Sequence, residues 1–254
     1  KNVKVSRETI LNGDFCEKLV LLKSKKIILT RKWAINESSK YYKINKSKYE
    51  YLPLGANILK IPKKKYLVKK IKKKKLSVCN LVSIGVHWNR KGMQKAISLT
   101  QKMNQLGQRT NLFIIGAQPP KNVVLPKNIK LIKFLDKNKN INELNKILYQ
   151  SHFHVLFSKT EAFGVVNCEA SAYGLFTITH DIGGIGGAIF NNKNGFRFSK
   201  NSPIEHISKY LINIFNNKKN FIRKSIDSRN IYDEKLNWSD IGKKLKSIVI
   251  NNIK

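Results

Sequence analysis

The feature that most limits the fold is a regular alternation of apolar and helix-type segments from residue 76 onward. Apolar runs at 78–85 and 112–116 are followed by stretches with helical spacing at 91–106 and 141–149. Continuous apolar strands that alternate with helices are typical of a parallel sheet covered by helices on both faces. The sequence therefore predicts an α/β domain of this kind. Further strands are expected at 129–135, 152–157 and 175–179, a helix at 164–173, and mostly helices in the C-terminal fifth.

The organisation of the chain follows from changes in composition along it. A lysine-rich stretch that contains Pro62 precedes the alternating region, and it predicts a linker. Before the linker, helices are expected at 15–22 and 32–42 and strands at 26–29 and 49–54. The chain is therefore expected to have four parts: 1–58, the basic linker 59–75, a Rossmann-like domain at 76–235 and a final helix within 236–254.

The net charge is the most unusual number in the composition. Lys and Arg total 50 and Asp and Glu total 15, so the formal charge is +35. Three explanations stay open: the codon bias of an AT-rich genome, attraction to an anionic membrane, and attraction to nucleic acid. Only seven of the 50 basic residues are Arg, and the lysines are spread along the chain, so no specific nucleic-acid partner is expected.

Several absences bound the cellular location. The three cysteines, Cys16, Cys79 and Cys168, are widely spaced and form no disulfide framework or metal signature. No apolar run approaches the roughly 20 residues needed to span a bilayer. The chain begins Lys1-Asn2 without Met or a signal peptide, which predicts a fragment. A reducing cytoplasm is therefore expected, with peripheral attachment at the inner membrane face as an option.

The loops after the strands are the expected place for chemistry, because ligands of open parallel sheets bind at the carboxyl ends of the strands. Glu161 lies in such a loop, Gly164 opens a helix, and Glu169 lies about a turn and a half inside it. A helix N-terminus suits a phosphate, and a half-buried carboxylate suits the two hydroxyls of a ribose. The alternative is that Glu161 caps the helix and Glu169 pairs with a lysine.

Two other loops are candidates. Arg90 and Lys91 follow the first strand of the alternating region, where cations can neutralise a diphosphate; a solvated basic turn is the alternative. Gly183 and Gly184 let backbone N–H groups approach a phosphate or sugar, with a plain tight turn as the alternative. His152 and His154 are expected to be structural, whereas His87 and His180 face the predicted cleft. No Asp-x-Asp pair is present, so no metal is expected.

Together these segments resemble the retaining glycosyltransferases of the GT-B fold, family 4, also called glycosyl transferases group 1. The strongest match is the E-x7-E motif that runs from Glu161 to Glu169 within Glu161-Ala162-Phe163-Gly164 and Cys168-Glu169-Ala170. Other matches are Lys91-Gly92, 112–117, 134–137, Ser158, Gly183-Gly184 and Asn194-Gly195. Before the linker, Trp33-Ala34, Tyr42 and 53–57 resemble the end of that family's N-terminal domain.

The resemblance implies a nucleotide-sugar donor with a UDP, GDP or ADP group, a glycan, lipid-linked or other glycoconjugate acceptor, retention of anomeric configuration, and no metal or other cofactor. It implies that Glu169 holds the ribose, that Glu161 holds the donor sugar, and that Lys91 neutralises the diphosphate. The donor-binding set it implies is Arg90, Phe163, Gly164, Val165, Glu169, Gly183 and Gly184. It also implies that 1–58 is the remnant of an acceptor-side domain and that the final helix crosses back to it.

The sequence departs from the family pattern at three points. Val86 stands where many members have an Arg, and Gly187 stands where many have a Glu. Most of the family's N-terminal domain has no counterpart here, which predicts an N-terminal truncation. The alternatives are therefore a non-catalytic or degenerate donor-binding domain and a basic membrane-associated module.

Overall fold

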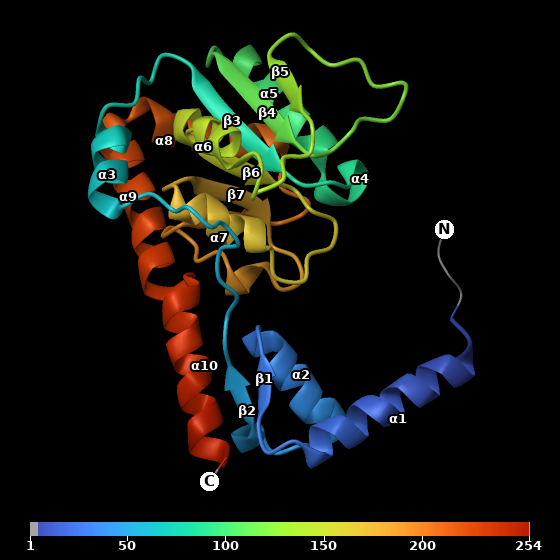
Figure 1. The fold of residues 1–254 in the computed structure, drawn as a ribbon. Helices are drawn as coiled ribbons and strands as arrows, with labels where there is room; N and C mark the ends of the chain where they lie inside the picture. Colours follow the sequence, from blue (N-terminus) through green and yellow to red (C-terminus); the bar gives the residue numbers. More distant parts are fainter. Residues whose placement is uncertain (1–4, 254) are drawn as a thin grey trace. The chain divides into compact units, whose positions relative to one another are not determined.

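The computed structural model describes residues 5–253 and divides the chain into two compact units (Figure 1). The larger unit is Leu54–Asp240, and the smaller one combines the residues up to Pro53 with those from Ile241 onward. Each unit has an apolar cluster of its own.

A six-stranded parallel sheet forms the centre of the larger unit, which confirms the predicted fold class. Val82 lies opposite Phe113 on one side and His154 on the other. Successive side chains of a strand point to opposite faces, so Leu81 and Val82 belong to two different core clusters. The strands, in spatial order, are β5 (Ile129–Ile132), β4 (Thr110–Ile115), β3 (Cys79–Ile84), β6 (Phe153–Leu156), β7 (Phe176–His180) and β8 (Gly195–Phe198).

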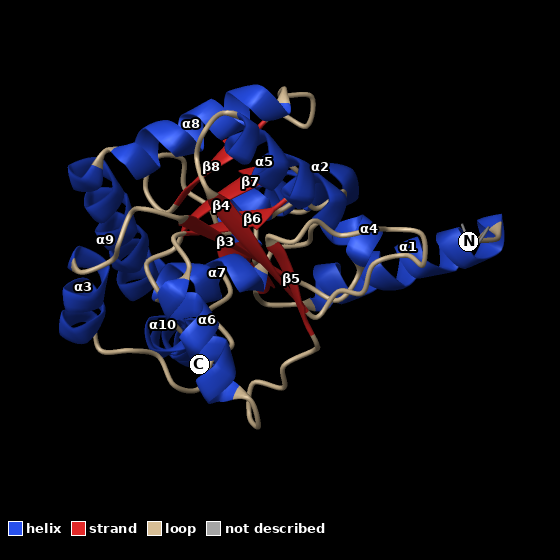
Figure 2. Cartoon of the chain, turned by 90° about the horizontal axis from the view of Figure 1, so that it is seen from above, coloured by secondary structure: helices blue, strands red, loops and turns tan. Residues whose placement is uncertain are grey.

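Helices cover both faces of this sheet (Figure 2). Helices α5 (Met93–Gln105) and α8 (Ile204–Asn216) contribute to the apolar cluster on one face, and α6 (Ile141–Gln150) and α7 (Val165–Ala172) contribute to the other. Helix α9 (Lys218–Lys235) has residues in both clusters. The remaining elements of this unit are α3 (Lys64–Lys72), α4 (Trp88–Lys91) and the 3-10 turn η2 (Ile185–Gly187).

The prediction of a linker at 59–75 has to be corrected. Helix α3 lies within this stretch and packs against α9. Leu67 and Ile71, four residues apart on one helix face, are each 1% exposed and belong to the core. The lysines around them occupy the other faces of the helix. Because lysine dominates the composition of this stretch, the apolar pair was not recognised in the sequence. The structure also differs from the single helix predicted at 91–106. Gly92 separates two helices, α4, which ends at Lys91, and α5, which begins at Met93.

The smaller unit contains a parallel pair of strands in which Ile27 lies opposite Tyr49. Ile27, Ile44 and Tyr49 form its buried cluster. Its elements are α1 (Arg7–Lys23), β1 (Ile27–Leu29), α2 (Lys32–Tyr42), the 3-10 turn η1 (Lys46–Lys48) and β2 (Tyr49–Tyr51). Helix α10 (Trp238–Ile253) starts in the larger unit, and its residues from Ile241 onward belong to the smaller one. Within 5–253, no helix combines the length and apolar character needed to cross a bilayer.

Candidate functional site

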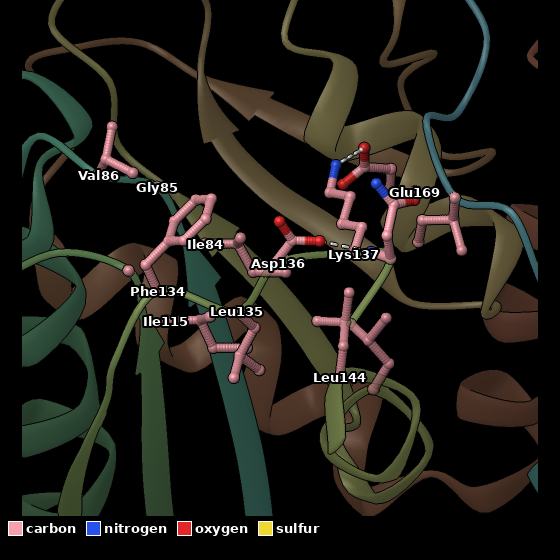
Figure 3. Close-up of a pocket in the computed structure, with 14 residues that line it drawn as sticks. Ile84, Gly85, Val86, Ile115, Phe134, Leu135, Asp136, Lys137, Leu144 and Glu169 are labelled. Atoms are coloured by element: carbon pink, nitrogen blue, oxygen red, sulfur yellow. Dashed lines mark hydrogen bonds and ion pairs between the residues drawn. The ribbon is translucent and has the colours of Figure 1, made fainter. Parts of the chain in front are cut away.

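A cavity of about 350 Å³ lies at the carboxyl ends of the central strands (Figure 3). Gly85 and Val86 follow β3, Gly116 follows β4, and 134–138 follow β5. Glu169 reaches the cavity from α7. The wall is mainly apolar, with Ile58, Ile84, Ile115, Phe134, Leu135, Leu144 and Leu148. The cavity therefore offers an apolar slot with two carboxylates, Asp136 and Glu169, and one lysine, Lys137, at its border.

The carboxylate of Glu169 is almost fully enclosed, with its side chain 3% exposed. Lys137 forms an ion pair and hydrogen bond with it, as Figure 3 shows, and the backbone N–H of Asn57 donates to it as well. Burial raises the pKa of Glu169, while Lys137 and this N–H act in the opposite direction. The expected alternative, a lysine partner for Glu169, is therefore present. Since the Lys137 side chain is 38% exposed, it has room to leave the carboxylate.

Glu161 and Lys91 form a second ion pair. The Nζ of Lys91 lies 2.6 Å from Oε2 of Glu161, and the Oγ of Ser158 donates to the same oxygen at 3.1 Å. The side chains of Lys91 and Glu161 are only 11% and 9% exposed. Glu161 is thus held by Lys91 and Ser158, and its carboxylate does not cap α7. Neither residue of the pair borders the 350 Å³ cavity.

Two glycines determine where Lys91 lies. A Cβ on Gly85 would lie 2.8 Å from Cγ of Lys91, so the lysine stem runs directly over this glycine. Gly92 has φ of +67°, and a Cβ there would lie 2.0 Å from the backbone oxygen of Phe157. Only glycine fits this close approach in a left-handed conformation. The break between α4 and α5 therefore fixes the position of Lys91.

Gly183 and Gly184 hold the loop that carries Glu161. The N–H of Gly184 donates to the backbone oxygen of Glu161 at 3.0 Å. Gly183 has φ of +54°, and a Cβ there would lie 2.3 Å from the same oxygen. The N–H of Gly184 is therefore already used by the protein, and the contribution of this glycine pair to the site is to position Glu161.

The start of α7 has free donors. Gly164 adopts φ of +82° at the N-cap, with buried Phe163 before it and half-buried Val165 after it. Within the described residues, the N–H groups of these three residues have no hydrogen-bond acceptor. An anion is the natural partner for such a helix N-terminus.

The remaining predicted residues lie around this centre. Arg90 is exposed, its backbone oxygen accepts from the N–H of Lys159 at 2.8 Å, and its guanidinium makes no ion pair within 5–253. Val86 borders the cavity and is 50% exposed, so no cation stands at that point. His152 has a structural role, since its Nδ1 accepts from the N–H of Asn80 at 2.9 Å. His154 is fully buried, and His180 lines a different cavity.

Three contributors were missed from the sequence. Lys137 was noted only as part of a family match, and the ion pair with Glu169 joins the loop after β5 to α7 across the fold. The hydrogen bond from Ser158 to Glu161 and the N–H of Asn57 on Glu169 were not foreseen either. Residue spacing carries no signal for contacts between such distant segments. No group of three or more His, Cys, Asp or Glu suited to a metal occurs in the part of the chain that the structure describes.

The fold is that of the GT-B glycosyltransferase structures. The model of the family "Glycosyl transferases group 1" matches residues 64–235, and the chain belongs to this family. The uncharacterized glycosyltransferase MJ1178 of Methanocaldococcus jannaschii is 26% identical over 118 residues, which are 46% of this chain and 32% of that protein. This chain therefore matches about a third of that relative's length.

Solved structures share the fold at low identity. A glycosyltransferase from Rickettsia africae has a TM-score of 0.72 at 17% identity, covering 96% of this chain and 67% of its own. WaaG, a glycosyltransferase involved in lipopolysaccharide biosynthesis, has a TM-score of 0.69 at 18% identity, with 94% and 67% covered. HepE of Anabaena, in complex with UDP and glucose, has a TM-score of 0.70 at 11% identity, with 94% and 66% covered.

Proposed function

We propose that this chain is the donor-binding part of a retaining glycosyltransferase that transfers a sugar from a nucleotide sugar to a glycan or lipid-linked acceptor. The observation that carries the proposal is the enclosed carboxylate of Glu169 beside an apolar cavity of about 350 Å³. A nucleoside fits these features, because its base takes the apolar slot and its ribose hydroxyls donate to the carboxylate. The UDP of the HepE complex supports a nucleotide of this class.

The diphosphate is assigned to the region between α7 and Lys91. The free N–H groups at Phe163, Gly164 and Val165 offer donors to its oxygens, and Lys91 and Arg90 offer positive charge. When the bond between the anomeric carbon and the phosphate oxygen breaks, negative charge accumulates on the diphosphate. A fixed cation stabilises this charge more than it stabilises the intact donor, and it therefore accelerates the step. In this proposal the cations come from the chain, and no metal is required.

Glu161 is proposed to hold the donor sugar. Its carboxylate is now paired with Lys91, and donor binding would exchange this pair for two new contacts, Lys91 to phosphate and Glu161 to a sugar hydroxyl. Gly183 and Gly184 fix the backbone of Glu161 for this purpose. The proposed location is the cytoplasm, with the net charge of +35 favouring contact with an anionic membrane face.

Titration of the chain with UDP, GDP, ADP and their sugars tests the donor site, with thermal unfolding as the measurement. A nucleotide that binds only the folded chain adds about 2.7 kcal/mol of stability at a hundredfold excess over its dissociation constant. Glu169→Gln should abolish the shift, and Glu143→Gln, at an exposed position of α6, should keep it. No shift with any nucleotide, or equal shifts in both variants, contradicts the proposal.

A second function, donor binding without catalysis or a basic membrane module, is favoured by one observation: Val86 leaves the cavity border without the cation that many family members have. Binding to anionic vesicles with no affinity for any nucleotide would support the membrane module. Nucleotide binding without sugar transfer, measured in a protein that carries a complete acceptor-side domain, would support the degenerate donor site.

A further inference from the structure

A second cavity, of about 560 Å³, lies on the α5 and α8 side of the sheet's carboxyl edge. Trp88, Phe157 and His180 line it together with Lys95, Lys159 and Lys200. The two cavities share no lining residue. The segment 85–92 supplies different residues to each, because Gly85 and Val86 line the 350 Å³ cavity and Trp88, Asn89 and Gly92 line this one. Its volume lies within the range of about 300–1,000 Å³ that is common for small-molecule sites.

His180 is the residue of this cavity that most strongly indicates a ligand. It stands at the end of β7, is 6% exposed, and packs its ring against Phe157 with 5.0 Å between ring centroids. Its Nε2 is buried without a hydrogen-bond partner within residues 5–253. Burial together with Lys95 and Lys200 lowers the pKa of His180 to about 4. An unpartnered buried ring nitrogen has a free-energy cost that a ligand hydrogen bond would remove.

The ionised side chains that line this cavity are all positively charged. Lys95, Lys159 and Lys200 are its ionised side chains, and no Asp or Glu is present among the described residues that line it. Lys95 is constrained, because its Nζ donates to the backbone oxygen of Lys200 at 3.2 Å and lies 5.7 Å from the centre of the Phe157 ring. Burial also lowers the pKa of Lys95, which reflects a positive charge without an anionic partner.

We propose that this cavity binds a small phosphorylated molecule, with the phosphate on the three lysines and the Nε2 of His180 and the organic part against Trp88 and Phe157. A phosphate has several acceptor oxygens and can therefore bind several of the lysine and histidine donors at once. No described carboxylate of the lining would repel it. The aromatic pair supplies an apolar surface that a bare ion would not use. The site does not depend on the donor function, because Glu169, Lys137, Lys91 and Glu161 are not part of it.

Calorimetric titration of the whole chain tests the site, with glucose 6-phosphate as the probe and glucose and inorganic phosphate as comparisons. The sugar phosphate should bind saturably and more tightly than phosphate, and glucose should not bind. The His180 ring resonances should shift in the same titration and should be saturated at the same ligand concentration. Vesicles with a phosphomonoester headgroup test whether a lipid is the natural source, since only an accessible lipid site would compete with the sugar phosphate.

Matched variants separate this site from a general charge effect. The triple variant Lys95→Gln, Lys159→Gln, Lys200→Gln should bind about tenfold more weakly or worse, since it loses charge-assisted hydrogen bonds. The triple variant Lys121→Gln, Lys127→Gln, Lys130→Gln removes the same charge at exposed positions and should bind as the unchanged chain does. Equal weakening in both triple variants overturns the proposal. His180→Phe is a second single-site test should the first triple variant fail to fold.

Discussion

Lys137 and Glu169 form an ion pair across the fold, from the loop after β5 to the buried face of α7. The pair is asymmetric, because Glu169 is 3% exposed and Lys137 is 38% exposed. Lys137 therefore favours the charged form of Glu169 and acts against the effect of burial, which raises the pKa of this carboxyl group. The carboxylate is enclosed, whereas its lysine partner is partly exposed to solvent.

Lys137→Met should make the stability of the chain more sensitive to pH. Without the ammonium, the pKa of Glu169 rises further above its ordinary value of 4.5, so the folded state retains a proton that the unfolded chain releases. Stability relative to the unchanged chain should therefore fall as pH rises from about 4.5. The loss at pH 8 should be about 1–2 kcal/mol, reduced by the exposure of Lys137. Urea unfolding at several pH values measures it; Lys139→Met, at an exposed neighbouring position, should change little.

Lys91 and Glu161 should be energetically coupled. Each is about nine-tenths buried, so removal of one leaves an uncompensated charge. Lys91→Met and Glu161→Gln should each cost about 3 kcal/mol, and the double variant should cost about 2 kcal/mol less than their sum. A double-mutant cycle in urea provides the measurement. The exposed pair Lys209 and Glu205 is the control, and its coupling should be close to the experimental error. Additive effects at the buried pair would contradict the expectation.

Gly92→Ala should destabilise the chain by about 3 kcal/mol or more, because it combines left-handed strain with a backbone clash. The added Cβ would lie 2.0 Å from the backbone oxygen of Phe157. Gly107→Ala is a matched control, since Gly107 has φ of +87° with nothing within 4 Å of the added Cβ. That variant should lose only about 1 kcal/mol from strain. Similar losses at both positions, measured by urea unfolding, would show that the contact with Phe157 yields easily.

His154 should make the fold sensitive to acid. Burial, and secondarily Lys91, lowers its pKa from 6.5 to about 3. The unfolded chain therefore binds a proton that the folded chain refuses, and this contribution to stability is present above pH 6.5 and is lost as pH falls toward 3. His154→Leu should flatten the stability profile between pH 6.5 and 4, whereas a substitution at exposed His206 should leave the slope unchanged. If the slope of stability against pH is unchanged in His154→Leu, this explanation is wrong.

The sequence predicted much of the larger unit because its signals are local. The helix at 32–42 was placed at its observed bounds, and the strands at 78–85 and 175–179 were placed to within a residue. Strand β8 was missed: it is only four residues long, begins with Gly195 and contains Arg197, so it has no continuous apolar run. Helix α3 was missed because lysines outnumber the apolar pair Leu67 and Ile71 that anchors it.

The sequence by itself determined the parallel α/β fold and which loops meet at the carboxyl edge of the sheet, because hydrophobic periodicity and strand direction depend on neighbouring residues. Only the tertiary structure decided which side chains became partners. Lys137 reaches Glu169 across 32 positions, Lys91 reaches Glu161 across 70, and Gly184 donates to the loop of Glu161. In a chain with 50 basic residues, composition does not distinguish the lysines buried against a carboxylate from the solvated ones. That distinction depends on burial and distance, which exist only after the strands and helices have packed.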